Sequence, residues 1–549
     1  MKLVYLLLIA AVIVSCSSKN NLASNVASGY DQAAILTKNA THENKRMQYK
    51  LITSKVLDKK AIQKSIKKQI KGFTSEDYET LKPLIYEQDI PTIQNHIQQG
   101  SLTYKMLVQW YLYRINKFEF EPNTSLHTII AINPNAVADA EARDLSRSSD
   151  DHGIFGMPIL LKDNINAQGM PTTAGAIALK DNYAEDAFIV KQMKNKGAII
   201  LGKVNLSEWA YFFCSGCPVG YSAIGGQTLN PYGRTIYETG GSSAGSGTSM
   251  AANYAAAAIG TETSGSILSP SSQNSVVGLK PTIGLLSRSG IVPISSTLDT
   301  PGPMTRNVID NAIVLSAMVG KDAQDSYTSL SFNEKDYTQN LEELDLVGLR
   351  LGANKSFMNN VPLYADIMVA LQKMGAEVFG YEPTKVDLDG FLSILNIDMR
   401  NDLPEYLTNH AGPKVQVRSV KDVMIFNQKD MDTRAPYDQE LFAGIIADET
   451  TDDELKEIIS NGQAAARAFF DVPMEKFELD AITSINNYDA SRAAIAYYPA
   501  LTIPMGYQED GEPMNLTIIA PSLSEEKLLK IGYVIEQATK LRVPPELGK

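Results

Sequence analysis

One lysine and two serines are the residues of this chain best suited to nucleophilic chemistry. Lys162 ends the apolar run Ile159-Leu-Leu-Lys162, and Ser242 and Ser266 each lie in a glycine-rich turn. A serine hydroxyl becomes a nucleophile when a base takes its proton, and a desolvated neutral lysine can act as that base. Because the chain holds only five histidines, the sequence favours a serine–lysine pairing over a serine–histidine pairing.

The elements around these residues predict a layered fold. Residues 248–259 are rich in alanine and lie between the two serine turns, so we expect a buried helix there. Strands that alternate with helices predict an α/β arrangement, with sites on the loops that leave the sheet. The further predicted strands are 128–133, 159–162 and 198–201, and the further predicted helices are 106–114 and 135–144.

The glycine–serine run at 240–246 has other interpretations. A flexible linker does not fit, because the run borders the most apolar region of the chain. A phosphate-binding loop needs Gly-Lys-Ser/Thr, but Thr248 follows Gly247. The segment Gly241-Ser-Ser-Ala-Gly245 does match the nucleophile elbow of α/β-hydrolases, with Ser243 as nucleophile. That interpretation needs a late histidine, and His410 is the only histidine after Ser243.

The start of the chain predicts export. Met1 and Lys2 precede an apolar run at 3–14, which is shorter than the roughly 20 residues that span a bilayer. The segment Ile13-Val-Ser-Cys16 resembles a bacterial lipoprotein signal, and an ordinary signal peptide is the alternative. We therefore expect residues 1–15 to be a signal peptide and residues 16–45 a tether. A lipid on Cys16 would hold the protein in the cell envelope, on the periplasmic side or in the outer membrane.

Composition limits the partners. The net charge of −12 argues against nucleic acid, because binding phosphates needs a basic surface. Lysines alternate with apolar residues at helical spacing from Lys55 to Lys71. This pattern fits either the solvated face of a helix or contact with an anionic membrane surface. The sequence does not determine the oligomeric state.

Two cysteines remain after Cys16. Cys214 and Cys217 are separated by Ser-Gly, a spacing that allows a local disulfide in an oxidising compartment. Two free thiols are the alternative. A thioredoxin-like motif would need a βαβ start around it, and a structural zinc site would need two more ligands; neither is apparent in the sequence.

Taken together, these segments resemble the amidase signature family of serine hydrolases. The resemblance covers roughly residues 85–545 and implies an α/β fold whose large mixed central β-sheet is covered by helices on both faces. Residues 46–84 would then be an N-terminal helical extension. The matching segments are Gly156-Met-Pro-Ile-Leu-Leu-Lys-Asp-Asn164, Gly240-Gly-Ser-Ser-Ala-Gly-Ser246, Val276-Val-Gly-Leu-Lys-Pro-Thr282, Ser287-Arg-Ser-Gly290, Asp299-Thr-Pro-Gly-Pro-Met304 and Tyr498-Pro-Ala-Leu-Thr-Ile-Pro-Met-Gly506, together with the 24-residue step from Ser242 to Ser266.

The resemblance implies a role for each residue of the triad. Ser266 would be the nucleophile, Ser242 the bridging serine after a cis peptide bond, and Lys162 the base. Neutral Lys162 would take a proton from Ser242, which would take one from Ser266. No metal or cofactor is required. The oxyanion hole would be formed by the backbone N–H groups of four consecutive residues, Thr263, Ser264, Gly265 and Ser266.

The substrate is predicted from finer features of the resemblance. Leu268 lies where many members have arginine, which argues against binding of a small α-carboxylate. The segments 202–209 and 225–231 look most like the peptide-amidase branch, which removes ammonia from C-terminal peptide amides. The aromatic segment 209–213 would line a substrate cleft or pack in the core. The alternatives are a hydrolase of fatty amides, aryl amides or esters, and a lipid-anchored binding protein without catalysis.

Overall fold

The fold is built on one mixed sheet of eleven strands. The computed structural model describes residues 31–329 and 335–547, and the predicted signal peptide lies outside these residues. The strand order is β1-β3-β2-β6-β8-β7-β12-β13-β11-β9-β10. The strands are β1 Ile129–Ile132, β2 Pro158–Lys162, β3 Ile199–Val204, β6 Ala257–Glu262, β7 Val277–Lys280, β8 Thr300–Thr305, β9 Arg350–Asn354, β10 Glu377–Tyr381, β11 Ala481–Ile485, β12 Ala500–Tyr507 and β13 Pro513–Ile519, with a separate hairpin of β4 Tyr221–Ser222 and β5 Gly226–Gln227.

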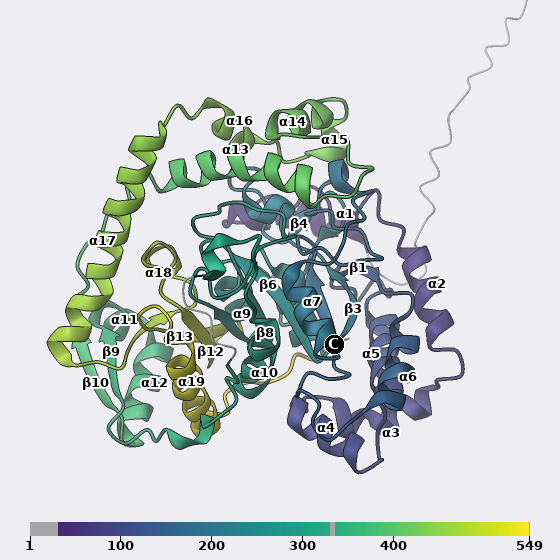
Figure 1. The fold of residues 1–549 in the computed structure, drawn as a ribbon, viewed down its shortest axis with the longest axis horizontal. Coiled ribbons are helices and arrows are strands. Elements are labelled where there is room, and N and C mark those ends of the chain that lie inside the picture. The colour runs from purple at the N-terminus through teal and green to yellow at the C-terminus, as the bar shows by residue number, and fades with distance from the viewer. Residues whose placement is uncertain (1–30, 330–334, 548–549) are drawn as a thin grey trace, which may run out of the picture.

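Helices surround this sheet on both faces, as Figure 1 shows. Helices α8 and α9 pack together and against β2, β6 and β12, and α10 and α19 form another packed pair against β8 and β12. The α-helices are α1 Gln32–Asn39, α2 Lys59–Gln69, α3 Ser75–Ile85, α4 Ile90–Gln98, α5 Tyr104–Phe118, α6 Ala136–Ser146, α7 Phe188–Asn195, α8 Ala244–Ala251, α9 Leu268–Gln273, α10 Val308–Met318, α11 Lys355–Asn360, α12 Pro362–Lys373, α13 Phe391–Asn409, α14 Val420–Gln428, α15 Met431–Arg434, α16 Glu440–Ala447, α17 Asp452–Phe477, α18 Ala490–Ala496 and α19 Glu525–Thr539.

The predicted α/β fold is confirmed, and most of the predicted elements are present. Strands β1, β2 and β3 and helices α5 and α6 lie where the sequence places them, with ends that differ by a few residues. Strand β2 is parallel to β3 on one side and to β6 on the other. The carboxyl ends of β2 and β6 therefore meet at one edge of the sheet, and both serine turns adjoin that edge.

The helix predicted over 248–259 is wrong in its second half. Helix α8 ends at Ala251, and the chain then enters β6 at Ala257. Asn253, with φ of 57°, adopts a left-handed conformation that ends the helix. Alanine has high helix propensity, but β6 lies between β2 and β8 and is buried along its whole length. Tertiary packing overrides the local propensity here.

The described part of the N-terminal region, from residue 31 onward, contains helices that pack against the body. Part of the expected tether, 32–39, forms α1, and the side chain of Asn39 at its end is buried. Helices α2 and α3 of the expected extension contribute Ile66 and Tyr78 to the main hydrophobic core. Within the described residues, no helix is long and apolar enough to cross a membrane.

Candidate active site

Lys162 is the last residue of β2, and its side chain is fully buried. Its Nζ lies 2.7 Å from Ser242 Oγ, 2.8 Å from Thr261 Oγ1 and 3.0 Å from the carbonyl oxygen of Thr261. Asn164 donates a further hydrogen bond to Thr261 Oγ1 at 3.0 Å. The structure therefore brings Lys162 and Ser242 together, and Thr261 of β6 fixes the position of the amine.

The pKa of Lys162 is unusually low, and burial of the side chain is the main cause. It lowers the pKa of Lys162 from the ordinary 10.5 to about 7, while the negative charges of Asp299 and Glu262 oppose the shift. The three partners of Nζ are hydroxyl and carbonyl oxygens, which can bind a neutral amine as well as an ammonium group. A substantial fraction of Lys162 is therefore uncharged near neutral pH.

Ser242 lies in the turn that leads into α8. The bond between Gly241 and Ser242 is cis, as the resemblance implies. The carbonyl oxygen of Ser242 accepts a hydrogen bond from the N–H of Ser207 at 3.0 Å. A side chain at Gly241 would come within 2.7 Å of Ser207 Oγ, so the turn also requires glycine. These contacts direct the Ser242 hydroxyl toward Lys162.

The neighbouring Ser243 is not available as an elbow nucleophile. Its buried hydroxyl donates to the carbonyl oxygen of Thr261 at 3.1 Å and accepts from the N–H of Thr261 at 3.2 Å. His410 stacks on Tyr406 of α13, with ring centroids 6.2 Å apart. The nucleophile-elbow interpretation therefore loses its serine, because both capacities of that hydroxyl are used by the backbone.

Ser266 lies in the turn after β6 and reaches the Ser242 turn through the backbone. The N–H of Ser243 donates to the carbonyl oxygen of Ser266 at 3.1 Å. Gly265, with φ of +101°, occupies a conformation that favours glycine. The side chain of Ser264 bonds Ser491 of α18 at 2.7 Å. Ser266 itself is partly exposed, so a substrate can reach it.

Glu262 stabilises the end of the Ser266 turn through backbone hydrogen bonds. Its buried carboxylate accepts hydrogen bonds from the N–H groups of Ile267 at 2.7 Å and Leu268 at 2.9 Å. Burial raises the pKa of Glu262, whereas the backbone hydrogen bonds and the charge of Lys280 lower it. Because α9 begins at Leu268, this carboxylate also caps the N-terminus of that helix.

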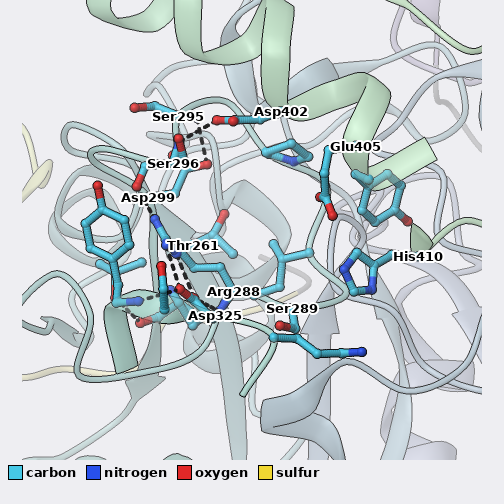
Figure 2. Close-up of a pocket in the computed structure, with 18 residues that line it drawn as sticks. Thr261, Arg288, Ser289, Ser295, Ser296, Asp299, Asp325, Asp402, Glu405 and His410 are labelled. Carbon is cyan, nitrogen blue, oxygen red and sulfur yellow. Dashed lines mark hydrogen bonds and ion pairs between the residues drawn. The ribbon is translucent and has the colours of Figure 1, made fainter. Parts of the chain in front are cut away.

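A cavity of about 270 Å³ adjoins these residues, and Figure 2 shows its walls. Thr261 and Asp299 belong to its lining, as do Asp402 and Glu405 of α13. Asp402 accepts a hydrogen bond from the N–H of Ser296 at 2.6 Å. Arg288, the cationic group in this wall, forms a paired contact with Asp325 at 2.7 Å. Burial raises the pKa of Asp299, and it raises the pKa of Asp402 to about 7, so both carboxyl groups ionise less readily than free aspartates.

The aromatic segment packs in the core instead of lining this cavity. Trp209 and Phe213 contact the ring of Phe442 of α16, with centroids 5.4 Å and 5.0 Å apart. Both side chains are at most 3% exposed. Cys214 and Cys217 form a disulfide directly after this segment. Of the two interpretations left open by the sequence, core packing is the one that the structure shows for Trp209 and Phe213.

A second buried lysine lies on the neighbouring strand. Lys203 of β3 forms an ion pair with Asp163, at 3.1 Å, and donates to the carbonyl oxygen of Ile165 at 2.6 Å. Thr172 Oγ1 lies 2.8 Å from the same amine. This network fixes the loop after β2, which begins one residue beyond Lys162.

Sequence reasoning assigned no role to several residues that surround the predicted triad. Thr261, Glu262, Asn164 and Asp299 surround Lys162 and the Ser266 turn, but none of them carries a catalytic motif alone. The available signal was position, because Thr261 and Glu262 close a buried strand directly before the serine turn. No group of three or more acidic, histidine or cysteine side chains suited to a metal ion occurs in the parts of the chain that the structure describes.

The mixed sheet places the chain in the α/β fold class, and the buried lysine–serine pair is suited to hydrolysis by a serine nucleophile. The Amidase family model matches residues 106–397. A probable amidase of Arabidopsis thaliana is 37% identical over 84% of this chain and 92% of its own length. The chain therefore belongs to the amidase family and is an amide-hydrolysing enzyme.

Two solved structures resemble the whole catalytic body. An amidase family protein from Bacillus anthracis is 35% identical, with a TM-score of 0.85 over 90% of this chain and all of that chain. The native peptide amidase from Stenotrophomonas maltophilia is also 35% identical, with a TM-score of 0.79 over 84% of this chain and 99% of that chain. One of these two similar structures is therefore named as an amidase that acts on peptides.

Proposed function

We propose that this enzyme cleaves the C–N bond of carboxamides through an acyl-enzyme on Ser266, and that its substrates are C-terminal peptide amides. The observation that carries the proposal is the 2.7 Å contact between Lys162 Nζ and Ser242 Oγ in a fully buried site. The similarity to a peptide amidase supports the choice of substrate.

The proton path follows from the partners of Lys162. A neutral amine has two N–H donors and one lone pair. The carbonyl and hydroxyl oxygens of Thr261 can accept the two N–H groups, which leaves the lone pair for the hydroxyl of Ser242. Ser242 then accepts the proton of Ser266 as Ser266 Oγ attacks the amide carbonyl carbon. The same proton returns to the leaving nitrogen as the C–N bond breaks, and ammonia departs.

The turn 263–266 stabilises the charge that develops on the carbonyl oxygen. Glu262 accepts hydrogen bonds from the N–H groups of residues 267 and 268, which holds the end of the turn that would present its N–H groups to the oxyanion. Loss of one oxyanion donor typically costs about 3–4 kcal/mol of transition-state stabilisation. A water molecule then attacks the acyl carbon, Lys162 again accepts the proton through Ser242, and the carboxylic acid is released.

The charges near the site favour a neutral amide over a substrate with a free α-carboxylate. Asp299, Asp402 and Glu405 line the adjoining cavity together with Arg288, which is paired with Asp325. Leu268 is apolar at the position where the family resemblance implies arginine. A substrate carboxylate placed there would find no unpaired arginine or lysine among the described lining residues. A peptide whose C-terminus is an amide lacks that carboxylate.

The decisive test is ammonia release from a panel of C-terminal peptide amides, fatty amides, aryl amides and free glutamine, with Ser266→Ala as control. We expect release from peptide amides that disappears in the variant. Release only from fatty or aryl amides would keep the mechanism and change the substrate class. No release by a folded enzyme from any amide would contradict the proposal and favour the binding role.

We also propose that the protein is exported and anchored in the cell envelope by a lipid on Cys16. The segment Ile13-Val-Ser-Cys16 and the disulfide between Cys214 and Cys217 support this placement, because disulfides persist in oxidising compartments. Metabolic labelling with a fatty acid should mark the wild-type chain and not a Cys16→Ser variant. Equal labelling of both chains would contradict the anchor.

A further inference from the structure

Helix α2 carries lysines on one side, and none of them belongs to the candidate active site. Lys60, Lys64, Lys67 and Lys68 are all exposed. At 3.6 residues per turn, these four positions fall within about 100° of the helix circumference. The opposite side carries Ile66, which is fully buried in the main core. The helix is therefore fixed to the body by its apolar side and presents its lysines outward.

The charge of this region is opposite to that of the rest of the protein. Residues 1–72 contain 13 lysines and arginines but only three acidic residues, in a chain whose net charge is −12. No acidic residue occurs between Lys59 and Ser75. Soluble surfaces usually intersperse both signs. A solvated helix face needs no such segregation, whereas an anionic partner would select for it.

The four lysines have no anionic partner within the protein. Among the residues that the structure describes, no ion pair joins any of them to a carboxylate. Lys59 on the same helix differs, because its amine lies 3.3 Å from His127 Nδ1 and burial lowers its pKa. Lys59 thus contributes to internal contacts, and the other four remain free to bind an external anion.

The position of α2 fits the proposed anchor. The N–H of Thr53, shortly before α2, donates to Gln32 Oε1 at 3.0 Å, so the chain enters the described body near this helix. Asp31 follows Cys16 by 15 residues, a length that spans at most about 50 Å. Figure 1 shows α2 at the outer edge of the molecule. A lipid on Cys16 would therefore leave this face within reach of the membrane surface.

We infer that the lysine face of α2, defined by Lys60, Lys64, Lys67 and Lys68, binds the anionic headgroups of a phospholipid bilayer and orients the enzyme on it. The inference rests on the envelope placement proposed above. A lysine near an anionic bilayer adds about 1 kcal/mol, which corresponds to about fivefold in affinity. The contact is electrostatic, because the apolar side of α2 is already buried in the core.

The test uses the chain from residue 16 onward with Cys16→Ser, so that no lipid contributes. Sedimentation with vesicles of equal phosphatidylglycerol and phosphatidylcholine is compared with pure phosphatidylcholine at 0.1 M salt. We expect binding only to the anionic vesicles, a loss of more than about 100-fold in K60Q/K64Q/K67Q/K68Q, and release of the wild type at high salt. The matched control K373Q/K385Q/K414Q/K421Q removes four exposed lysines elsewhere and should bind like the wild type.

Both variants should hydrolyse a soluble amide at the wild-type rate, which separates this inference from the proposed activity. Equal binding of the wild type to both vesicle types, or an equal loss in the control variant, would overturn it. Tighter binding to a soluble anionic polymer such as heparin than to anionic vesicles would assign the face to that class of partner instead. The salt dependence of the wild type tests the inference even if the fourfold variant does not fold.

Discussion

Two lysines buried to the same extent on neighbouring strands have different surroundings. Lys203 of β3 faces the carboxylate of Asp163 at 3.1 Å, whereas Lys162 of β2 contacts only hydroxyl and carbonyl oxygens. Burial lowers the pKa of both, and at Lys203 the adjacent carboxylate opposes that shift directly. Under the proposed mechanism, the buried lysine with a paired carboxylate has a structural role, and the one with neutral partners is the base. The partner, more than the burial, separates the two roles.

Removing the amine of Lys162 is the strongest test of this comparison. Lys162→Met keeps the apolar stem but leaves Ser242 without a base, so kcat/KM should fall by roughly 10⁴–10⁶-fold. The variant should remain folded, because no carboxylate loses its partner. Steady-state ammonia release together with thermal unfolding measures both effects. Activity within 100-fold of the wild type would remove Lys162 from the mechanism.

The same change at Lys203 should affect stability instead. Lys203→Met leaves the charge of Asp163 buried and unpaired, which costs about 3–5 kcal/mol of unfolding free energy. Adding Asp163→Asn removes that charge and should recover most of the loss. Denaturant unfolding of the single and double variants measures the effect. If Lys203→Met were as stable as the wild type, the ion pair would have no structural role.

The pH dependence of kcat/KM tests the charge state of Lys162 and the influence of the neighbouring carboxylates. Protonated Lys162 cannot accept a proton, so kcat/KM should decrease as the pH falls through about 7 and reach a plateau above it. The charge of Glu262 raises the pKa of Lys162, so Glu262→Gln should move this limb to lower pH. Weaker support of the Ser266 turn should also lower the plateau by on the order of 10- to 100-fold.

Glu525→Gln is the matched control for the pH experiment. Glu525 is equally buried and accepts a backbone hydrogen bond from Thr282, but its charge acts on Lys280 and not on Lys162. In Glu525→Gln, kcat/KM should fall over the same pH range as in the wild type. An identical shift in both variants would show that the change reflects altered stability and not the charge next to Lys162.

The smallest expected effect is at His410. This histidine lines the cavity, but the hydroxyl of Ser243, its potential partner, is bonded to the backbone of Thr261. His410→Ala should therefore leave kcat/KM for a small amide within about twofold of the wild type, measured in the ammonia assay. A loss of kcat/KM comparable to that of Lys162→Met would indicate that His410, and not Lys162, is the base.

The candidate site residues could be predicted from the sequence because their motifs are local. The apolar run before Lys162 and the glycine-rich turns around Ser242 and Ser266 each signal their conformation within a few residues. The α/β class followed from the alternation of strands and helices. The predicted helix over 248–259 failed in part because alanine is compatible with both a helix and a buried strand. Helix α1 was not predicted, because it depends on distant contacts such as that of Asn39 with the carbonyl oxygen of Thr235.

The sequence by itself determined which groups are available for chemistry: one lysine after a strand, two serines in glycine turns, and a basic N-terminal segment in an acidic chain. Only the tertiary structure decided their states. Lys162 has a lowered pKa because burial of β2 between β3 and β6 disfavours its charged form. Ser243 and the aromatic side chains of Trp209 and Phe213 lost their candidate roles to partners remote in sequence. Burial and partner identity depend on contacts between distant segments, which local patterns do not encode.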